Sequence, residues 1–98
     1  MPIFKIDRTQ IRPSLEVEFL DWSEADEAYI QTTYGDSGMR VAFVRELSPD
    51  GLCLIRRNTW ASYDDYLTYI EDPRCSPYFI ARDEYNSANG IISYSEIV

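Results

Sequence analysis

The side chains best suited to chemistry lie between residues 56 and 82, in a stretch that mixes arginine, asparagine, tryptophan and tyrosine. Asn58 and the phenol of Tyr66 can donate hydrogen bonds to an oxyanion that develops on a substrate. Trp60 offers a broad apolar surface for the wall of a pocket. A guanidinium, at Arg56 or at Arg82, keeps its charge when buried and could anchor an anion. These side-chain types could line a pocket for a small molecule.

Each of these residues also has a purely structural interpretation. Trp60 could seal the junction between a strand and the following helix, and Tyr66 falls within an apolar helical stripe. Asn58 could satisfy hydrogen bonds of the fold, and Arg82 could extend from a helix into solvent. The sequence leaves both interpretations open.

Charged residues near the predicted pocket have the same two interpretations. Glu16 and Glu18 could face Arg56 and Arg57 across a sheet, which would make them cross-strand ion pairs. If Arg56 instead lies inside a closed cavity, it could hold an anionic substrate. We therefore include Arg56 and Glu18 as candidate substrate-binding residues.

The chain has no histidine, which excludes several reaction classes in their usual form. The common general base, the Ser/His and Cys/His nucleophile pairs and histidine-ligated haem all require that side chain. Cys53 and Cys75 are too far apart for a CxxC motif, so a metal set is not indicated. We expect reduced thiols, a cytoplasmic location, no metal and no cofactor.

A net charge of −8 argues against a surface for nucleic acids, because phosphate binding requires a basic footprint. No apolar run approaches the ~20 residues of a membrane span, and the N-terminus lacks the pattern of a signal peptide. We therefore expect neither a nucleic-acid nor a membrane partner. An acidic inhibitor that mimics nucleic acid is a third-ranked alternative, which would need carboxylates aligned on one face.

The first third of the chain predicts a strand followed by a helix. Residues 1–13 contain two prolines and no clean period, which indicates an N-terminal arm, with at most a short extended piece at residues 3–6. Residues 14–20, SLEVEFL, alternate apolar and acidic side chains, as a half-buried strand does. Ser23 is a suitable N-cap for a helix that ends at the GDSG of residues 35–38.

The rest of the chain predicts a hairpin, a broken helix and a last strand. Residues 39–47 and 52–60 flank the turn signal SPDG. Ser62 caps a helix whose apolar stripe is interrupted by EDPRCSP, and Ser76-Pro77 restarts it. Asn89-Gly90 ends this second part, and residues 91–98 form the final strand.

The predicted order β-α-β-β-α-β gives a single ferredoxin-like α+β domain over residues 14–98. Right-handed crossovers place both helices on one face of a four-stranded antiparallel sheet. With the strand of residues 14–20 facing the helices through its apolar side chains, the uncovered face would hold Arg56, Asn58 and Trp60. Such a mixed face is neither clean core nor clean solvent surface, so we expect it to meet a second copy of the chain or line a cavity.

The element order and the segment LIRRNTWASYDDYLTYIEDPRCSPYF resemble the dimeric α/β-barrel proteins, within them the antibiotic-biosynthesis-monooxygenase-like group. The resemblance extends from about residue 14 to residue 98. It implies a homodimer and cofactor-independent oxygenation of electron-rich phenols. Asparagine, tryptophan, tyrosine and arginine side chains there position the substrate and promote its deprotonation. Asn58, Trp60, Tyr66 and Arg82 match these types and their approximate order.

The sequence therefore predicts a cofactor-free, monooxygenase-like enzyme for a small aromatic or phenolic substrate in the cavity of a homodimer. Asn58, Trp60, Tyr66 and Arg82 are the candidate catalytic residues. The alternative is a non-catalytic dimeric module that binds a small ligand or a protein partner.

Overall fold

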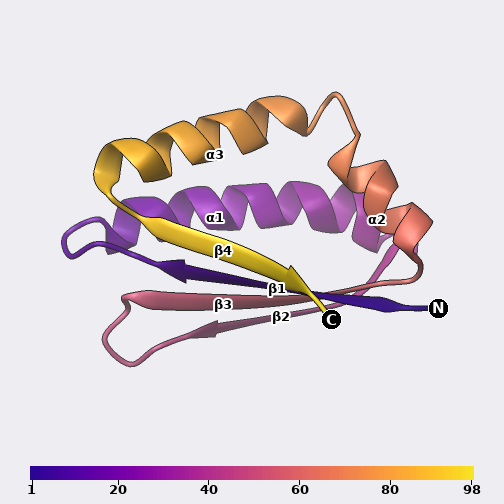
Figure 1. The fold of residues 1–98 in the computed structure, drawn as a ribbon, viewed down its shortest axis with the longest axis horizontal. Helices are drawn as coiled ribbons and strands as arrows, with labels where there is room; N and C mark the ends of the chain where they lie inside the picture. Colours follow the sequence, from indigo (N-terminus) through magenta and orange to yellow (C-terminus); the bar gives the residue numbers. More distant parts are fainter.

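A computed structural model describes all 98 residues of the chain (Figure 1). Its elements follow in the order β1 (Ile3–Gln10), α1 (Glu16–Ile30), a π-helical turn η1 (Gln31–Gly35), β2 (Arg40–Leu47), β3 (Cys53–Trp60), α2 (Tyr63–Ile70), α3 (Ser76–Asn89) and β4 (Ile92–Ile97). The β-α-β-β-α-β order is confirmed, with the second helical segment divided into α2 and α3.

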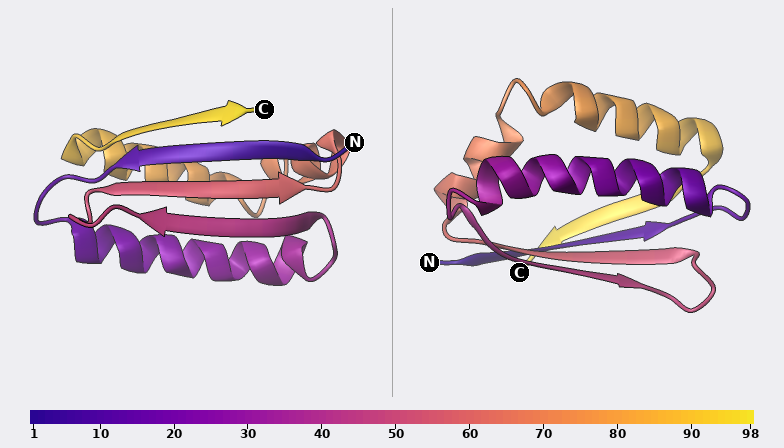
Figure 2. Two further views of the ribbon diagram at one scale, coloured as in Figure 1. Left: turned by 90° about the horizontal axis from the view of Figure 1, so that it is seen from below. Right: turned by 180° about the vertical axis from the view of Figure 1, so that it is seen from behind.

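The four strands form one antiparallel sheet in the order β2-β3-β1-β4, which is the ferredoxin-like arrangement. The helices α1 and α3 lie side by side over one face of this sheet (Figure 1). The other face carries no helix, as the view from below shows (Figure 2). The predicted fold class is confirmed.

The first strand lies earlier in the chain than predicted. Ile3–Gln10 is a central strand, paired with both β3 and β4, so the predicted arm over residues 1–13 is wrong. The alternation of buried and exposed residues along this strand is hard to recognise in the sequence because its buried face is polar. Lys5, Asp7 and Thr9 lie on that face and are partly or fully buried. Buried positions are usually apolar, so this pattern resembles a solvent-exposed segment.

The predicted strand at residues 14–20 is the beginning of α1. Phe19, Ser23 and Ile30 are the buried residues of this helix, at intervals of four and seven, whereas Val17 is 74% exposed. This is the helical period, and it overrides a short local alternation. Ser23, predicted as an N-cap, lies in the interior of α1 with its side chain buried.

The SPDG turn, the Ser62 cap and the helix end at Gly90 are confirmed. The Gly51 amide donates to the Ser48 carbonyl at 2.9 Å in the β2–β3 turn, and the Ser62 hydroxyl accepts from the Asp65 amide at 3.1 Å. Gly90 ends α3 with a φ of 67°, a left-handed conformation that glycine adopts without strain.

The two faces of β3 are the reverse of those predicted. Leu54, Arg56, Asn58 and Trp60 are all buried beneath the helices, and the uncovered face carries the alternate residues. The prediction depended on the misplaced first strand. Pairing with the true β1 puts Lys5 opposite Asn58 and Asp7 opposite Arg56.

Apolar packing divides into two clusters at opposite ends of β3. One cluster surrounds Trp60, and the other surrounds Leu54. The two residues are six positions apart, about 20 Å along an extended strand. Arg56 and Asn58 lie between them on the same face, so the middle of the layer beneath the helices is polar.

Candidate functional site

The centre of the site is a buried group of polar side chains on β1 and β3. Asp7 is 7% exposed, and its carboxylate accepts hydrogen bonds from the Asn58 amide at 3.5 Å and from the Ser95 hydroxyl. Lys5 Nζ lies 3.3 Å from Asp7 Oδ1. Burial lowers the pKa of Lys5, and the neighbouring Asp7 opposes that shift. Asp7 is thus fully engaged in holding these strands together.

Arg40 extends this network from β2 to α1. Its guanidinium donates to Glu27 Oε2 at 2.7 Å, to Asn58 Oδ1 at 3.0 Å and to Gln31 Oε1 at 3.2 Å. A guanidinium with a buried carboxylate partner and additional acceptors is well compensated for its loss of water. The Asn58 amide therefore already bridges Arg40 and Asp7.

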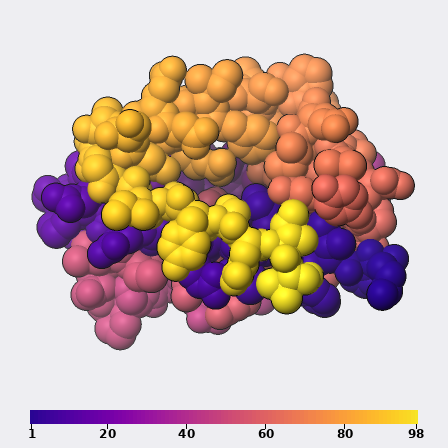
Figure 3. Space-filling view, in the orientation of Figure 1, coloured from indigo at the N-terminus to yellow at the C-terminus, as the bar shows by residue number.

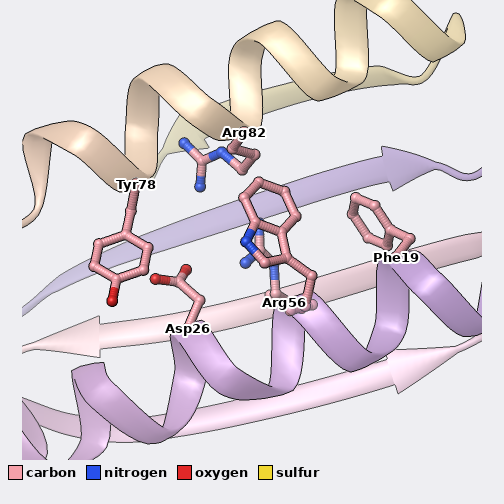
Figure 4. A pocket seen from close by; sticks show the side chains of 7 residues that line it. Phe19, Asp26, Arg56, Tyr78 and Arg82 are labelled. Atoms are coloured by element: carbon pink, nitrogen blue, oxygen red, sulfur yellow. The ribbon is translucent and has the colours of Figure 1, made fainter.

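Arg56 and Arg82 are the arginines at the site that have no such compensation. Arg56, on β3, is 6% exposed, its Nε has no hydrogen-bond partner, and it forms no ion pair. Arg82 extends from α3 toward the same space (Figure 4). Its guanidinium carbon lies 5.4 Å from the Phe79 ring centre. These two cations give the buried space a positive lining, and Asp26, which lines the same cavity, forms no ion pair with either of them.

Two small cavities meet at these arginines. The first is lined by Phe19, Trp22, Ser23, Asp26, Arg56, Tyr78 and Arg82 (Figure 4). The second is lined by Lys5, Asp7, Ile30, Arg56, Asn58, Trp60, Tyr69 and Arg82. Each offers about 10 Å³ to the centres of water-sized spheres, which is room for about one water. In this conformation the interior is nearly filled.

An aromatic cluster closes one end of the second cavity. Trp60 is 1% exposed and stacks on Tyr69 with ring centres 5.0 Å apart. Tyr66 and Tyr34 each approach the Trp60 ring at 6.0 Å. The indole Nε1 is buried and has no hydrogen-bond partner. Trp60 therefore serves both as core packing and as cavity wall, and it has a donor left for a ligand.

The structure brings together four of the six residues predicted for the site. Asn58, Trp60, Arg56 and Arg82 line the same cavity. Tyr66 lies behind Trp60 and is not part of the cavity lining. Burial raises the pKa of Tyr66, so its phenol stays protonated.

Glu18 lies outside this cavity. It is exposed on α1 and lines an outer groove of about 340 Å³, together with Trp22, Ala81 and Tyr85. Trp22 lines both this groove and the first inner cavity. A narrow gap beneath α3 is visible on the molecular surface (Figure 3).

Sequence reasoning missed Lys5, Asp7, Ser23 and Asp26, all of which face the inner cavities. The available signals were the polar face of residues 3–10 and a serine and an aspartate at core-facing positions of α1. Both signals depend on the correct assignment of β1 and α1. No cluster of three or more side chains could hold a metal ion. No helix has both the length and the apolarity to cross a membrane.

Comparison with known proteins shows similarity to solved structures. No family model and no curated protein matches the chain. SnoaB, a cofactor-independent oxygenase from Streptomyces nogalater, superposes with a TM-score of 0.73 at 12% identity over 99% of this chain and 90% of that one. The chain has the fold of the antibiotic-biosynthesis-monooxygenase-like proteins.

Two further structures extend this similarity. A protein from Deinococcus radiodurans, assigned as an antibiotic biosynthesis monooxygenase, has a TM-score of 0.76 at 4% identity over 98% of this chain and 89% of that one. A dimeric ferredoxin-like protein from an uncultured marine organism has a TM-score of 0.67 at 7% identity over 99% and 92%. The resemblance predicted for the sequence is thus confirmed at the level of fold.

Proposed function

We propose that the protein is a cofactor-independent, monooxygenase-like enzyme that acts on a small aromatic or phenolic substrate beneath its helices. The observation that carries this proposal is the convergence of Asn58, Trp60, Arg56 and Arg82 on one buried cavity. A flat aromatic ring suits the Trp60 wall, and an anion derived from it suits the two unpaired guanidiniums. SnoaB, with the same fold, is a cofactor-independent oxygenase.

The proposed reaction balances with dioxygen as the oxidant. A base removes a proton from an activated CH₂ group, and the resulting carbanion is delocalised onto the phenol oxygen. Its electrons pass to O₂, a C–O bond forms, and the hydroperoxide loses water to leave a carbonyl. One oxygen atom enters the product and the other leaves as water, so no separate reductant is needed.

The protein's part in this scheme is electrostatic. Arg56 and Arg82 stabilise the delocalised anion in a space from which water is nearly excluded. The free Nε1–H of Trp60 can donate to the same oxygen. Asn58 holds Arg40 and Asp7 in place, and Tyr66 supports the Trp60 ring. Each has a positioning role rather than direct contact with the substrate.

Access for a substrate requires α1 and α3 to separate, because each inner cavity accommodates about one water. The outer groove between these helices is the natural entrance, since Trp22 lines both the groove and the first cavity. Movement of helices around a ligand is common among enzymes that exclude water during the reaction.

The proposal includes a homodimer formed through the uncovered sheet face. That face exposes large apolar side chains on three strands: Phe4, Val44, Ile92 and Tyr94. A second copy would cover them, and a protein of the same fold is described as dimeric. A cytoplasmic location is also part of the proposal, supported by the two unpaired thiols, Cys53 and Cys75.

The second candidate is a non-catalytic dimeric module that binds a small ligand or a protein. The small volume of the inner cavities favours it, because a nearly filled interior leaves little space for chemistry. It predicts ligand binding without turnover.

Oxygen uptake with the hydroxylated anthrone dithranol distinguishes the two candidates. The enzyme hypothesis predicts uptake faster than in buffer, a marked loss in Arg56→Met, and little change in the control Arg12→Met. Arg12 is a suitable control because it is exposed in the loop between β1 and α1 and lines neither inner cavity. Saturable binding of dithranol under argon, with no acceleration in air, would favour the binding module.

A further inference from the structure

Asp26 is an acid on the core-facing stripe of α1. Phe19, Ser23, Asp26 and Ile30 follow one another at intervals of four, three and four, so all four face the sheet. Phe19 and Ile30 are buried apolar residues, as expected for such a stripe. A carboxylate at the third position contributes no apolar packing, which calls for an explanation in terms of function.

The surroundings of Asp26 are cationic and aromatic. Arg56 and Arg82 line the same cavity, and Asp26 and Arg82 extend toward each other from facing helices (Figure 4). Several titratable and charged groups on the surrounding elements face Asp26. They lie on β2, β3, α2, α3 and the turn before α3, and they are Arg40, Arg56, Tyr69, Tyr78, Arg82 and Cys75.

The Asp26 carboxylate has both oxygens available. No hydrogen bond or ion pair in the structure involves it. Asp7, the other carboxylate at the inner cavities, has contacts from Lys5, Asn58 and Ser95. The oxygens of Asp7 are therefore occupied by neighbouring side chains. Of the two carboxylates, Asp26 is the one whose oxygens are free to contact a substrate.

We propose that Asp26 is the general base of the reaction, and that Arg56 and Arg82 receive the anion it generates. This inference rests on the proposed function and names the base that the proposed reaction requires. The substrate is the one already proposed, an aromatic compound with an acidic C–H whose conjugate base is delocalised onto a phenolic oxygen.

The proposed step conserves charge within the cavity. The proton moves from carbon to a carboxylate oxygen of Asp26, and the negative charge moves from Asp26 to the substrate. The net charge of the site is unchanged, and the arginines stay protonated throughout. The arrangement therefore stabilises the product of proton transfer without importing an ion.

The electrostatics of Asp26 agree with this role. Burial raises the pKa of its carboxyl group, and the nearby Arg82, Arg56 and Arg40 partly oppose the shift. The carboxyl group is thus more basic than an exposed aspartate, as a general base requires. The rate should rise with pH through this raised pKa and then level off.

Hydrogen exchange on dithranol tests the base separately from the oxygen step. Under argon in deuterated buffer, loss of the CH₂ signal in the proton NMR spectrum measures proton removal alone. We expect the protein to accelerate this exchange, and Asp26→Asn to reduce the acceleration about 100-fold. Asp21→Asn, an exposed position on the same helix, is the matched control and should behave as the unmodified protein.

The outcomes separate this inference from the proposed function. Exchange that depends on Asp26, without oxygen uptake in air, would support the base and contradict the oxygenase. Oxygen uptake with equal exchange in Asp26→Asn would contradict the base and leave the oxygenase intact. Absence of any accelerated exchange would also overturn the base. A loss in Asp26→Asn counts only if dithranol still binds and the pH dependence of the residual rate disappears.

Discussion

The side-chain oxygen of Asn58 accepts a hydrogen bond from the guanidinium of Arg40 at 3.0 Å. This bond joins β3 to β2, and the same amide reaches Asp7 on β1 at 3.5 Å. Asn58 therefore connects the three strands beneath the helices. Both ends of its amide are occupied, which makes it a positioning residue for the cavity.

Replacement of Asn58 by alanine should destabilise the fold. The change leaves Arg40 and Asp7 each without one buried partner, and such a loss costs about 1–3 kcal/mol. Denaturant unfolding would measure it, with Asn89→Ala at the end of α3 as a comparison. An unfolding free energy equal to that of the unmodified protein would show that the Arg40–Asn58–Asp7 connection does not stabilise the sheet.

Trp60 should respond differently to two substitutions. Trp60→Ala removes a ring packed against three tyrosines and should cost about 3–5 kcal/mol. Trp60→Phe keeps an aromatic ring beside Tyr69 but loses the second ring of the indole with its unpartnered N–H, so it should cost less stability than Trp60→Ala and the fold should persist. If that N–H binds the substrate anion, turnover should fall about tenfold, equivalent to ~1.4 kcal/mol. Unchanged turnover in Trp60→Phe would restrict Trp60 to packing.

Asp26→Asn should make the protein more stable at neutral pH. Because burial raises the pKa of Asp26, the folded chain binds more protons than the unfolded chain above an unfolded pKa of about 3.9. Stability contributed by this group therefore decreases as pH rises through the raised pKa. The asparagine variant lacks that decrease, so its melting temperature should exceed that of the unmodified protein by an amount that grows as pH rises through the raised pKa.

These melting experiments must stay above the pH at which Asp72 begins to affect stability. Hydrogen bonds from Arg74 and Tyr34 lower the pKa of Asp72, so its stabilising contribution is lost only as pH falls below about 3.9. Scans from about pH 4.5 to 7.5 avoid this effect. A constant difference between the Asp26→Asn and unmodified chains across that range would contradict a raised pKa at Asp26.

Phe4→Glu should weaken the homodimer without unfolding the chain. Phe4 lies on a central strand of the uncovered sheet face and is 51% exposed in the single chain. A buried carboxylate at a dimer interface is costly unless it finds a cation. Sedimentation analysis should show dissociation in Phe4→Glu and none in the control Val17→Glu on α1. If the unmodified protein sediments as a monomer, the proposed homodimer is wrong.

The parts of the fold that the sequence predicts correctly have local causes. The SPDG turn, the Ser62 cap and the glycine at position 90 each depend on a few neighbouring residues, so they can be recognised without the rest of the structure. The short alternation of residues 14–20 is also local, but Phe19, Ser23 and Ile30 pack at a helical period that becomes visible only over a longer segment. Tertiary packing therefore determines that this segment forms a helix and not a strand.

The site was only partly predictable because its polar and charged residues are buried, whereas such residues are usually exposed. Arg56 and Asn58 lie beneath the helices, where apolar residues are expected, and the polar face of β1 made that strand resemble an arm. Residue types identified Asn58, Trp60, Arg56 and Arg82 as candidates. The base could not be found in this way, since Asp26 is distinguished only by its phase on α1. Glu18 was predicted as a site residue because residues 14–20 were expected to form a strand, and this segment is the beginning of α1.

Stoichiometric oxygenation of dithranol tests the central claim most directly. An oxygen electrode and mass spectrometry, with isotopically heavy O₂, would follow the reaction of the unmodified protein beside Arg56→Met. The account predicts that each carbonyl formed consumes one O₂ and takes its oxygen atom from that gas, at a rate that falls sharply in Arg56→Met. Oxidation no faster than in protein-free buffer, or equally fast in Arg56→Met, would contradict it.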